Sequence, residues 1–339
     1  MKVIVDDKIP YIREAIERIA SDVIYLPGAK ITKADLIDAD AMIIRTRTPC
    51  DAALLEGTSI QFIATATIGF DHLDTAYLAK AGIPWSNCPG CNASSVGQYV
   101  HAAFLVLREQ KGLDLAHLTV GIVGMGHVGK EVEKALRPFG CRILRNDPPR
   151  QEAEGGDFVS LHTLAEQCNV ITFHTPLIFE GLHPTFHLAD KEFFASLRHQ
   201  PVILNAGRGE VVDNRAILYA MDKRLVSEAI IDTWENEPHV VTPLLERAFL
   251  ATPHIAGYSA DGKANATRMA LQALCTHFDL NIPFTIVPPA LPASFCPSPD
   301  ADTRALQLYD PRTDSNALKA APENFEYLRS HYPLRREAL

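Results

Sequence analysis

The stretch at residues 119–136, TVGIVGMGHVGKEVEKAL, decides the fold of this chain. Its first residues are β-branched or small, as in a buried strand, and apolar side chains recur at helical spacing after residue 127. Three glycines lie between the two patterns. Gly124 allows a tight turn, Gly126 lets another group approach the backbone, and Gly129 lets the following helix pack against the strand. The stretch therefore predicts a strand, a turn and a helix whose N-terminus can face an anionic group.

A second strand pattern, CRILRND at 141–147, makes this common glycine motif more specific. A carboxylate at the end of the next strand is placed to bind a ribose diol, while the helix N-terminus receives a pyrophosphate. We therefore expect a dinucleotide site with Asp147 on the ribose. Because a carboxylate repels a 2′-phosphate, NAD is favoured over NADP, although Arg145 and Arg150 leave NADP open.

The rest of the chain alternates short apolar runs with helical patterns, which predicts βαβ units and parallel sheets. Near-continuous Val, Ile and Leu in the later runs indicate strands buried on both faces, as in a doubly wound sheet. Long helices are expected at 92–110 and 259–281. The predicted strands are 2–7, 41–46 and 61–69, then 119–124, 141–147, 170–175, 201–207, 228–234 and 249–254.

Composition limits the class of protein. A net charge of −9 over 339 residues argues against a nucleic-acid partner. No apolar run is long enough for a bilayer and the N-terminus lacks a signal-peptide core, so we expect a cytoplasmic protein with no membrane partner. The seven cysteines show no disulfide framework. Cys88 and Cys91 form a lone CxxC, which we interpret as an ordinary loop, with no metal, rather than a zinc or redox site.

Three later segments each carry a residue suited to catalysis directly after a predicted strand. They are NAGRGEVVD with Arg208, DTWENEP with Glu237 and TPHIAGY with His254. Taken alone, these are a solvated cation, a surface carboxylate and a loop histidine. Because the carboxyl ends of parallel strands lie at one edge of a sheet, their shared placement predicts that they act together.

These residue types suit the oxidation of a 2-hydroxy acid. Imidazole titrates near neutral pH, so His254 can take the hydroxyl proton while a hydride leaves C2. Glu237 can bind the far ring nitrogen and stabilise the imidazolium. Arg208 can bind the substrate carboxylate and the C2 oxygen with its forked guanidinium.

The order of these motifs resembles that of the D-isomer-specific 2-hydroxyacid dehydrogenases, whose catalytic arginine, glutamate and histidine fall on Arg208, Glu237 and His254. The resemblance implies an α/β fold with two doubly wound parallel-sheet domains, a flavodoxin-like substrate domain and a Rossmann NAD domain, with a short C-terminal appendage. The expected bounds are 1–95 and 262–285 for the substrate-binding domain, 96–261 for the NAD-binding domain, and 286–339 for a Pro-rich connection and a truncated dimerisation segment.

The same resemblance assigns the cofactor contacts to the glycine turn, to the strand ends and to the turn after His254. Asp232 could face the nicotinamide carboxamide or only cap its own turn, and both interpretations stay open. The expected NAD-binding residues are Gly124, Gly126, His127, Val128, Gly129, Asp147, Thr175, Ala206, Gly207, Asp232 and Gly257.

Further segments resemble one branch of this family. ATATIGFDHLD (64–74), NDPPR (146–150), HIAGYSADGK (254–263) and the tail YDPRTD … HYPLRRE look like the 4-phosphoerythronate dehydrogenases. This implies NAD-dependent oxidation of 4-phospho-D-erythronate to (R)-3-hydroxy-2-oxo-4-phosphooxybutanoate in pyridoxal 5′-phosphate (vitamin B6) biosynthesis. A sibling enzyme acting on 3-phosphoglycerate, glycerate or hydroxypyruvate is the nearest alternative, and a non-catalytic NADH-sensing scaffold is a remote one.

Such a substrate is a small phosphorylated hydroxy acid with an anion at each end, so it needs a second anion site besides Arg208. IIRTRT at 43–48 offers Arg45 and Arg47, although either could instead be a rim charge that steers the substrate. Thr46-Arg47 replaces the family's usual Ser-Val pair, so the phosphate contacts are expected to differ in detail. The resemblance implies that Thr46, Thr67 and Tyr258 contact the substrate. The expected substrate-binding residues are therefore Arg45, Thr46, Thr67 and Tyr258.

The resemblance also implies an oligomer. The family's C-terminal domain pairs two subunits, and in this sequence the corresponding segment is expected to be shortened, with LRREAL as residues 334–339. We therefore expect a homodimer that pairs through helices of the cofactor domain or through a reduced tail.

Overall fold

The computed structural model describes residues 1–338 and separates into two compact units. Unit 1 contains residues 1–92 and 260–291, and unit 2 contains 93–259 and the chain from residue 292 onward. The predicted bounds treated everything after residue 285 as a separate segment, whereas residues from 292 onward group with unit 2. The physical reason is that Leu318 and Phe325 from this segment are fully buried in the core of unit 2.

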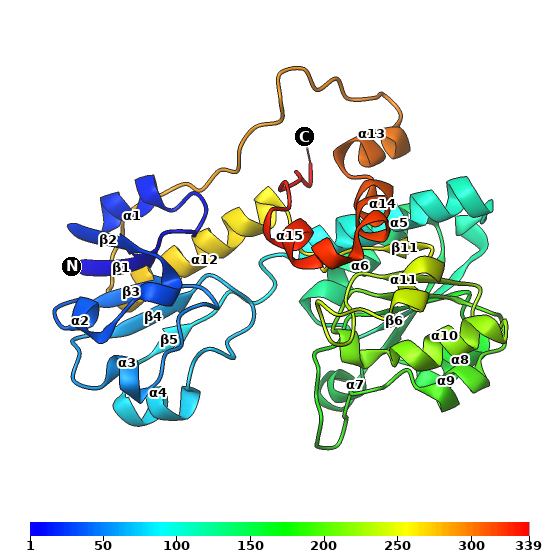
Figure 1. Ribbon diagram of the computed structural model, residues 1–339, viewed down its shortest axis with the longest axis horizontal. Coiled ribbons are helices and arrows are strands. Elements are labelled where there is room, and N and C mark those ends of the chain that lie inside the picture. Colours follow the sequence, from blue (N-terminus) through cyan, green and yellow to red (C-terminus); the bar gives the residue numbers. More distant parts are fainter. Residues whose placement is uncertain (339) are drawn as a thin grey trace. The chain divides into compact units, whose positions relative to one another are not determined.

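Unit 1 is built on a five-stranded parallel sheet in the order β2-β1-β3-β4-β5 (Figure 1). This is the flavodoxin-like order, which the sequence predicted for the first domain. Two strands, β2 and β5, were not predicted, because β2 is a short run with a polar start and β5 has only two residues. The strands are β1 (Lys2–Asp6), β2 (Asp22–Leu26), β3 (Ala41–Ile44), β4 (Phe62–Thr65) and β5 (Trp85–Ser86).

Helices cover both faces of the unit 1 sheet. Val3, Val5 and Ile43 pack into one core with α1 and α12. Ile4 and Met42 pack into a second core with α2, α3 and α4. Since alternate residues of a strand point to opposite faces, burial on both faces explains the continuous apolar runs. The helices are α1 (Arg13–Ile19), α2 (Lys33–Leu36), α3 (Ala52–Leu55), α4 (Thr75–Ala81) and α12 (Ala260–His277).

Unit 2 contains a six-stranded parallel sheet in the order β11-β10-β9-β8-β6-β7. The chain winds outward in both directions from the neighbours β6 and β8, so the sheet is doubly wound with its switch point between them. The predicted fold class, two doubly wound parallel-sheet α/β domains, is therefore confirmed. The strands are β6 (Thr119–Val123), β7 (Arg142–Asn146), β8 (Val170–Phe173), β9 (Val202–Asn205), β10 (Glu228–Ile231) and β11 (Leu250–Ala251).

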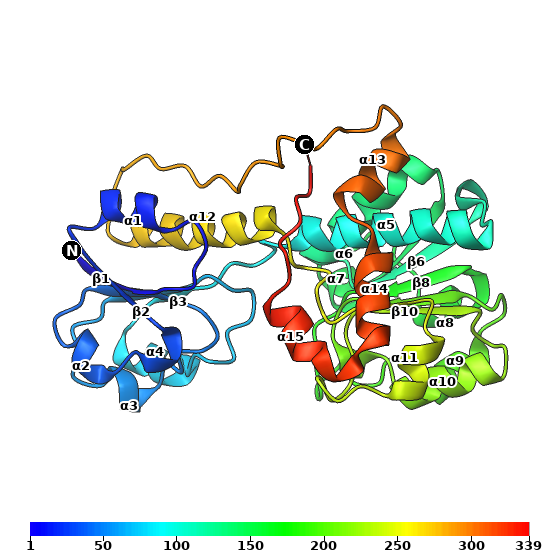
Figure 2. The ribbon, with the colours of Figure 1, turned by 45° about the horizontal axis from the view of Figure 1, so that its top comes forward.

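Both faces of the unit 2 sheet are again covered (Figure 2). Val120 and Ile122 pack against α5 and α6, while Ile171 and Phe173 pack against α8, α9 and α10. Each strand stops one to three residues before its predicted end, because the chain leaves the sheet there to form the loops of the site. The helices are α5 (Ala93–Lys111), α6 (His127–Leu136), α7 (Pro148–Glu154), α8 (Leu161–Gln167), α9 (Lys191–Ser196), α10 (Asn214–Asp222) and α11 (Thr242–Arg247).

The C-terminal segment adds three helices to unit 2. They are α13 (Ala301–Leu308), α14 (Pro311–Ala320) and α15 (Phe325–Ser330). α14 packs beside β11 and α5, and the Ala251 N–H donates to Ser315 Oγ at 3.0 Å (Figure 2). The predicted dimerisation role of this segment stays a prediction. Within residues 1–338, no helix has the length and apolar character needed to cross a bilayer.

The cysteines are free thiols, and most are buried. Burial raises the pKa of Cys50, Cys88 and Cys168 to about 12 and that of Cys91 to about 11. Cys88 Sγ donates to the carbonyl of Thr65. The CxxC pair therefore belongs to the core of unit 1, with both thiols protonated at neutral pH.

We expect the native protein at pH 8 to react rapidly with DTNB at one of its seven cysteines, Cys296, the exposed one. The five buried thiols need local unfolding before a thiolate can form, and half-buried Cys141, whose pKa burial raises, should react more slowly than Cys296. Absorbance at 412 nm gives the number of thiols that react in buffer and the number that react in urea. Cys296→Ser should abolish the fast phase, and a fast phase from several thiols in the native protein would contradict the burial of Cys88 and Cys91.

Candidate active site

The carboxyl ends of the unit 2 strands carry the residues singled out in the sequence. The glycine turn follows β6, Asp147 follows β7 and Thr175 lies just beyond β8. Arg208 lies beyond β9, Asp232 directly follows β10, and His254 lies beyond β11. Because all six strands are parallel, these residues lie along one edge of one sheet.

The glycine turn has the geometry that its sequence predicted. Gly124 has φ +91°, and a methyl group on Gly129 would lie 2.0 Å from the Gly124 carbonyl oxygen. A methyl group on Gly126 would meet nothing within 4 Å, so the space in front of the turn is open. α6 begins directly after Gly126, with exposed His127 and half-buried Val128 in its first turn. The turn therefore fits a pyrophosphate at the helix N-terminus.

Asp147 closes the other side of this turn. Its Oδ2 accepts a hydrogen bond from the Met125 N–H at 2.8 Å, and its Oδ1 accepts one from the Arg150 N–H at 3.1 Å. The nearby arginines are paired. Arg145 forks onto Glu133 at 2.6 and 2.8 Å, and Arg150 pairs with Glu154 at 2.6 Å.

A buried hydroxyl without a partner lies beside the turn. Thr175 Oγ1 has no hydrogen-bond partner within residues 1–338, and its methyl group would lie 3.0 Å from a Cβ on Gly124. A Cβ on Gly207 would approach Thr175 N and O to 3.3 and 3.2 Å, so the backbones after β8 and β9, including Ala206, run close together. An unsatisfied buried hydroxyl is costly unless a ligand completes it, which fits a cofactor contact at this point.

Arg208 is exposed at the end of the β9 loop. Its Nη1 donates only to the carbonyl of Gly207, at 2.9 Å, and no carboxylate of the described chain pairs with it. The next residue, Gly209, packs directly against the backbone of Trp234, since a Cβ on Gly209 would lie 1.9 Å from the Trp234 carbonyl oxygen. A rigid loop thus presents an unpaired cation to solvent.

Glu237 and His254 form a hydrogen-bonded pair. His254 Nδ1 lies 2.8 Å from Glu237 Oε2, and Glu237 Oε1 accepts the Trp234 N–H at 2.9 Å. The other ring nitrogen of His254, Nε2, has no partner in the part of the chain that the structure describes, and the side chain is 27% exposed. The pair therefore has the form of a general base oriented by a carboxylate.

The electrostatics of Glu237 support this assignment of charges. Burial alone raises the pKa of Glu237, but the His254 ring, the Trp234 N–H and Arg329 lower it further than burial raises it. The net pKa lies below its ordinary value, so the carboxylate stays ionised at neutral pH. An ionised partner on Nδ1 leaves Nε2 as the nitrogen that exchanges a proton.

His254 holds an uncommon backbone conformation, and Asp232 supports it. The φ angle of His254 is +56°, a left-handed value that disfavours residues other than glycine. Asp232 is 1% exposed, and its carboxylate accepts the N–H groups of Ile255 and Ala256 at 2.8 and 3.0 Å and the Thr252 hydroxyl at 2.6 Å. Asp232 therefore caps the turn that carries His254 rather than its own turn, and its cofactor contact stays a prediction.

Arg335, from the C-terminal segment, supports the same turn from the other side. Its guanidinium is 8% exposed and donates to the carbonyls of Ile255, Ala256 and Tyr258 at 3.0, 2.6 and 2.8 Å. Gly257, the last expected cofactor contact, lies half-buried within the braced turn. The turn that carries His254 is thus held by an anion on one side and a cation on the other.

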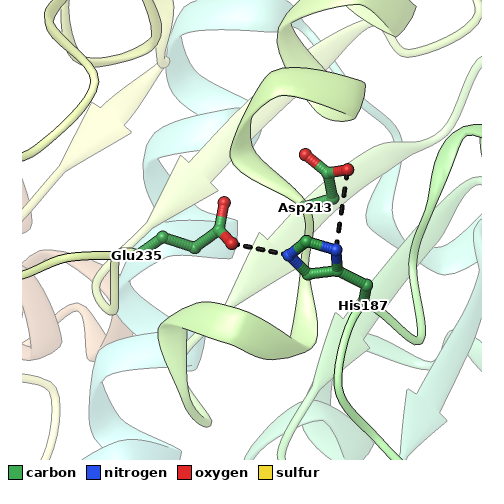
Figure 3. Close-up of side chains that lie close together, drawn as sticks. All are labelled: His187, Asp213 and Glu235. Carbon is green, nitrogen blue, oxygen red and sulfur yellow. Dashed lines mark hydrogen bonds and ion pairs between the residues drawn. The ribbon is translucent and has the colours of Figure 1, made fainter.

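His187 bridges the carboxylates of Asp213 and Glu235 (Figure 3). Its Nε2 lies 2.6 Å from Glu235 Oε1, and its Nδ1 lies 3.8 Å from Asp213 Oδ2. The Glu235 Oε2 also accepts the Asn214 N–H at 2.8 Å. One possible ligand atom from each of His187, Asp213 and Glu235 lies within 4.8 Å of the other two. The ring already pairs with both carboxylates, and these contacts tie together the loops that carry these residues.

Two of the expected substrate residues, Arg45 and Thr46, follow strand β3 of unit 1, and they differ in their contacts. Arg45 donates from Nε and Nη2 to the two carboxylate oxygens of fully buried Asp6, both at 3.2 Å. Thr46 is exposed, as is the neighbouring Arg47, which no carboxylate of residues 1–338 pairs with. The guanidinium that remains available for an anion is therefore that of Arg47.

Thr67 lies in the loop after β4 and has an internal network. Its Oγ1 donates to the Gly69 carbonyl at 2.8 Å and lies 2.7 Å from Thr65 Oγ1. The hydroxyl proton is thus already used, and one lone pair remains for a donor. Thr67 belongs to unit 1 and Tyr258 to unit 2.

Sequence reasoning missed the residues that support the site. Asp6, His187, Glu235, Arg329 and Arg335 each contact a predicted site residue or its loop. None belongs to a motif with a fixed spacing to its partner. Only strand-end carboxylates such as Asp6 carried a signal, since β1 ends at the same sheet edge as β3.

Comparison with known proteins identifies the family. Residues 96–256 match the family described as D-isomer specific 2-hydroxyacid dehydrogenase, NAD binding domain. The erythronate-4-phosphate dehydrogenase of Bacteroides fragilis is 53% identical over 338 residues, 99% of this chain and 97% of that protein. That of Azotobacter vinelandii is 42% identical over 355 residues, 99% of this chain and 93% of that protein. The chain belongs to the D-isomer specific 2-hydroxyacid dehydrogenases, in the erythronate-4-phosphate dehydrogenase branch. The family predicted from the motifs is thereby confirmed.

Solved structures agree on the fold. The structure of D-2-hydroxyisocaproate dehydrogenase matches with a TM-score of 0.69 at 22% identity, over 82% of this chain and 97% of that one. A D-lactate dehydrogenase from Aquifex aeolicus, complexed with NAD and lactic acid, matches with a TM-score of 0.63 at 22% identity, over 82% of this chain and 96% of that one. The family's dinucleotide domain thus corresponds to the doubly wound sheet of unit 2.

Two glycine substitutions separate binding from folding. Gly126→Ala should leave the melting temperature nearly unchanged, because the φ angle of Gly126 is −70° and a methyl group there meets no neighbouring atom. The same methyl group should weaken NADH binding at least ~10-fold, because it would occupy the space that the pyrophosphate needs. Gly129→Ala should lower the free energy of unfolding by about 1–3 kcal/mol, because its methyl group meets a carbonyl. NADH fluorescence titration and thermal melts measure the pair, and tight NADH binding by Gly126→Ala would contradict the assigned phosphate position.

Proposed function

We propose that this protein oxidises the C2 hydroxyl of 4-phospho-D-erythronate to the 2-oxo acid with NAD, in pyridoxal 5′-phosphate biosynthesis. The observation that carries the proposal is 53% identity over 99% of the chain to a protein named erythronate-4-phosphate dehydrogenase. The His254–Glu237 pair and the unpaired Arg208 supply the chemistry that such an oxidation needs. A scaffold without catalysis would not need an oriented base and an unpaired cation at the same edge of one sheet.

In this proposal His254 removes the proton. Its free Nε2 takes the proton of the C2 hydroxyl while Nδ1 stays hydrogen-bonded to Glu237. The C2–H bond breaks with its electron pair, and the electrons of the O–H bond form the C2=O bond. NAD, when bound, supplies the acceptor for the departing hydride. The ionised Glu237 stabilises the imidazolium that results, as its lowered pKa supports.

Arg208 binds and orients the acid. Its guanidinium carries no competing carboxylate among the residues described, so it can bind the substrate carboxylate with two hydrogen bonds. Its rigid loop holds the charge in place, which reduces the entropy lost on binding. In the reverse direction the same cation polarises the keto group.

For the cofactor we propose NAD rather than NADP. The chain's own residues that would hold it are the glycine turn, Asp147 and the unpartnered hydroxyl of Thr175. Arg145 and Arg150, which left NADP open in the sequence, are both paired with glutamates. Neither arginine is therefore free for a 2′-phosphate, while the Asp147 carboxylate repels one.

For the substrate phosphate we propose Arg47, with Thr46 beside it. Arg47 is exposed and unpaired within the described residues, whereas Arg45 is bound to Asp6. An unpaired guanidinium matches a phosphate better than one whose fork is already filled. Thr67 and Tyr258 keep their predicted substrate contacts as part of this proposal.

We further propose that the protein acts in the cytoplasm as a homodimer. Free thiols at all seven cysteines suit a reducing compartment. On unit 2, Phe179 and Leu182 are 65% and 79% exposed, and large exposed apolar side chains are common where subunits meet.

A substrate panel tests the proposed reaction. Initial rates of NADH formation with 4-phospho-D-erythronate, 3-phosphoglycerate and glycerate should give a kcat/KM at least ~100-fold higher for the first. His254→Ala is the matched control, since it should lose at least ~100-fold in turnover yet bind NADH like the unmodified protein. Equal kcat/KM values for the three acids would overturn the substrate assignment, and an active His254→Ala variant would overturn the mechanism.

Two arginine variants test the phosphate site. Arg47→Gln should raise KM for 4-phosphoerythronate at least ~10-fold and leave the melting temperature unchanged, because an exposed cation is lost. Arg45→Gln should lower the free energy of unfolding by about 2–3 kcal/mol, because Asp6 stays buried without its partner. If substrate affinity were lost only in Arg45→Gln, the phosphate site would have to be assigned to Arg45 instead.

A further inference from the structure

The C-terminal segment brings a cation to the catalytic pair. Arg329 lies in α15, and its Nη1 is 3.7 Å from Glu237 Oε2, the oxygen that holds His254. The same guanidinium forms a hydrogen bond to the side chain of Tyr258. One residue thus contacts both the carboxylate that orients the base and the tyrosine expected to contact the substrate.

Arg329 is held firmly in this position. Phe325, at the start of α15, is fully buried in the core of unit 2, and Leu328 packs against that core. The side chain of Arg329 is 28% exposed, and its Nε is buried without a partner in the described chain. Burial lowers the pKa of Arg329, but Tyr258 and Glu237 raise it further, so the guanidinium stays charged. A buried charge with an unused donor is costly for a purely structural residue.

We propose that Arg329 is a positioning residue of the active site, a cation that orients Glu237 and partly offsets its charge, so that His254 releases its proton at lower pH. The inference rests on the proposed dehydrogenase function, because that function assigns His254 as the base.

The electrostatic reasoning has a definite sign. An ionised carboxylate on Nδ1 makes the imidazole hold a proton more tightly, and a cation beside that carboxylate weakens this effect. Asp232, beneath the turn, attracts the imidazolium as well, and Glu326 lies near Arg329 on α15. Arg335 is a second cation at this turn, where its guanidinium donates to the backbone carbonyls of Ile255, Ala256 and Tyr258. Arg329, beside the phenol of Tyr258, is the cation paired with the Glu237 carboxylate itself.

The pH profile of kcat/KM for oxidation tests this role. Arg329→Gln should move the acidic limb of the profile to higher pH by about 0.5–1 unit. At pH values below the limb kcat/KM should fall ~3–10-fold, and at pH values above it kcat/KM should be nearly unchanged. Arg329→Lys restores the charge and should return the limb close to its original position. A loss of equal size at every pH, or an unmoved limb, would overturn the proposal.

Two further variants control for charge and for folding. Arg312→Gln removes another cation of the C-terminal segment, one paired with Asp310 and Glu109, and should leave the limb unmoved. Arg329→Met keeps the apolar stem and removes the charge, so it replaces Arg329→Gln if that variant fails to fold. Its limb should shift in the same direction.

A measurement without substrate separates this inference from the proposed function. NMR titration of the His254 ring in the substrate-free protein, with the signal assigned by its loss in His254→Gln, should show the same upward shift in Arg329→Gln. If 4-phosphoerythronate is not oxidised but the shift is present, the reaction is wrong and the role of Arg329 stands. If the substrate is oxidised but the titration is unmoved, the role of Arg329 is wrong.

Discussion

The active site depends on a carboxylate buried beneath a turn. Asp232 gathers two backbone N–H groups and one hydroxyl from residues 252–256, and this hydrogen bonding stabilises His254 at a φ of +56°. A left-handed conformation costs a residue such as histidine about 1–2 kcal/mol, so it persists only where the surroundings impose it. In return, the ring points Nδ1 at Glu237 and leaves Nε2 free.

The same turn connects the catalytic pair with the C-terminal segment. Arg335 donates hydrogen bonds to three backbone carbonyls of the turn, and Arg329 forms an ion pair with Glu237. The segment after residue 300 therefore contributes charge and support to the loops that carry the proposed catalytic residues of unit 2.

The pairing of the arginines decides which of them can act. Arg45, Arg145 and Arg150 are bound to carboxylates, so their charge is already offset. Arg208 and Arg47 are exposed without such a partner in the described residues. An arginine binds a carboxylate or phosphate strongly only when its fork is unoccupied, and the free ones match the two anionic ends of the proposed substrate.

By itself, the sequence determined the elements whose signal is local: the buried strands, the glycine turn, and the strand ends that carry Arg208, Glu237 and His254. Such signals survive because a parallel sheet places the carboxyl ends of its strands at one edge, so order along the chain becomes position in space. Only the tertiary structure decided that Arg45 belongs to Asp6, that Asp232 caps the turn of His254, and that Arg329 reaches Glu237. These contacts join residues far apart in the chain through packing, and packing has no repeat or spacing that a sequence displays.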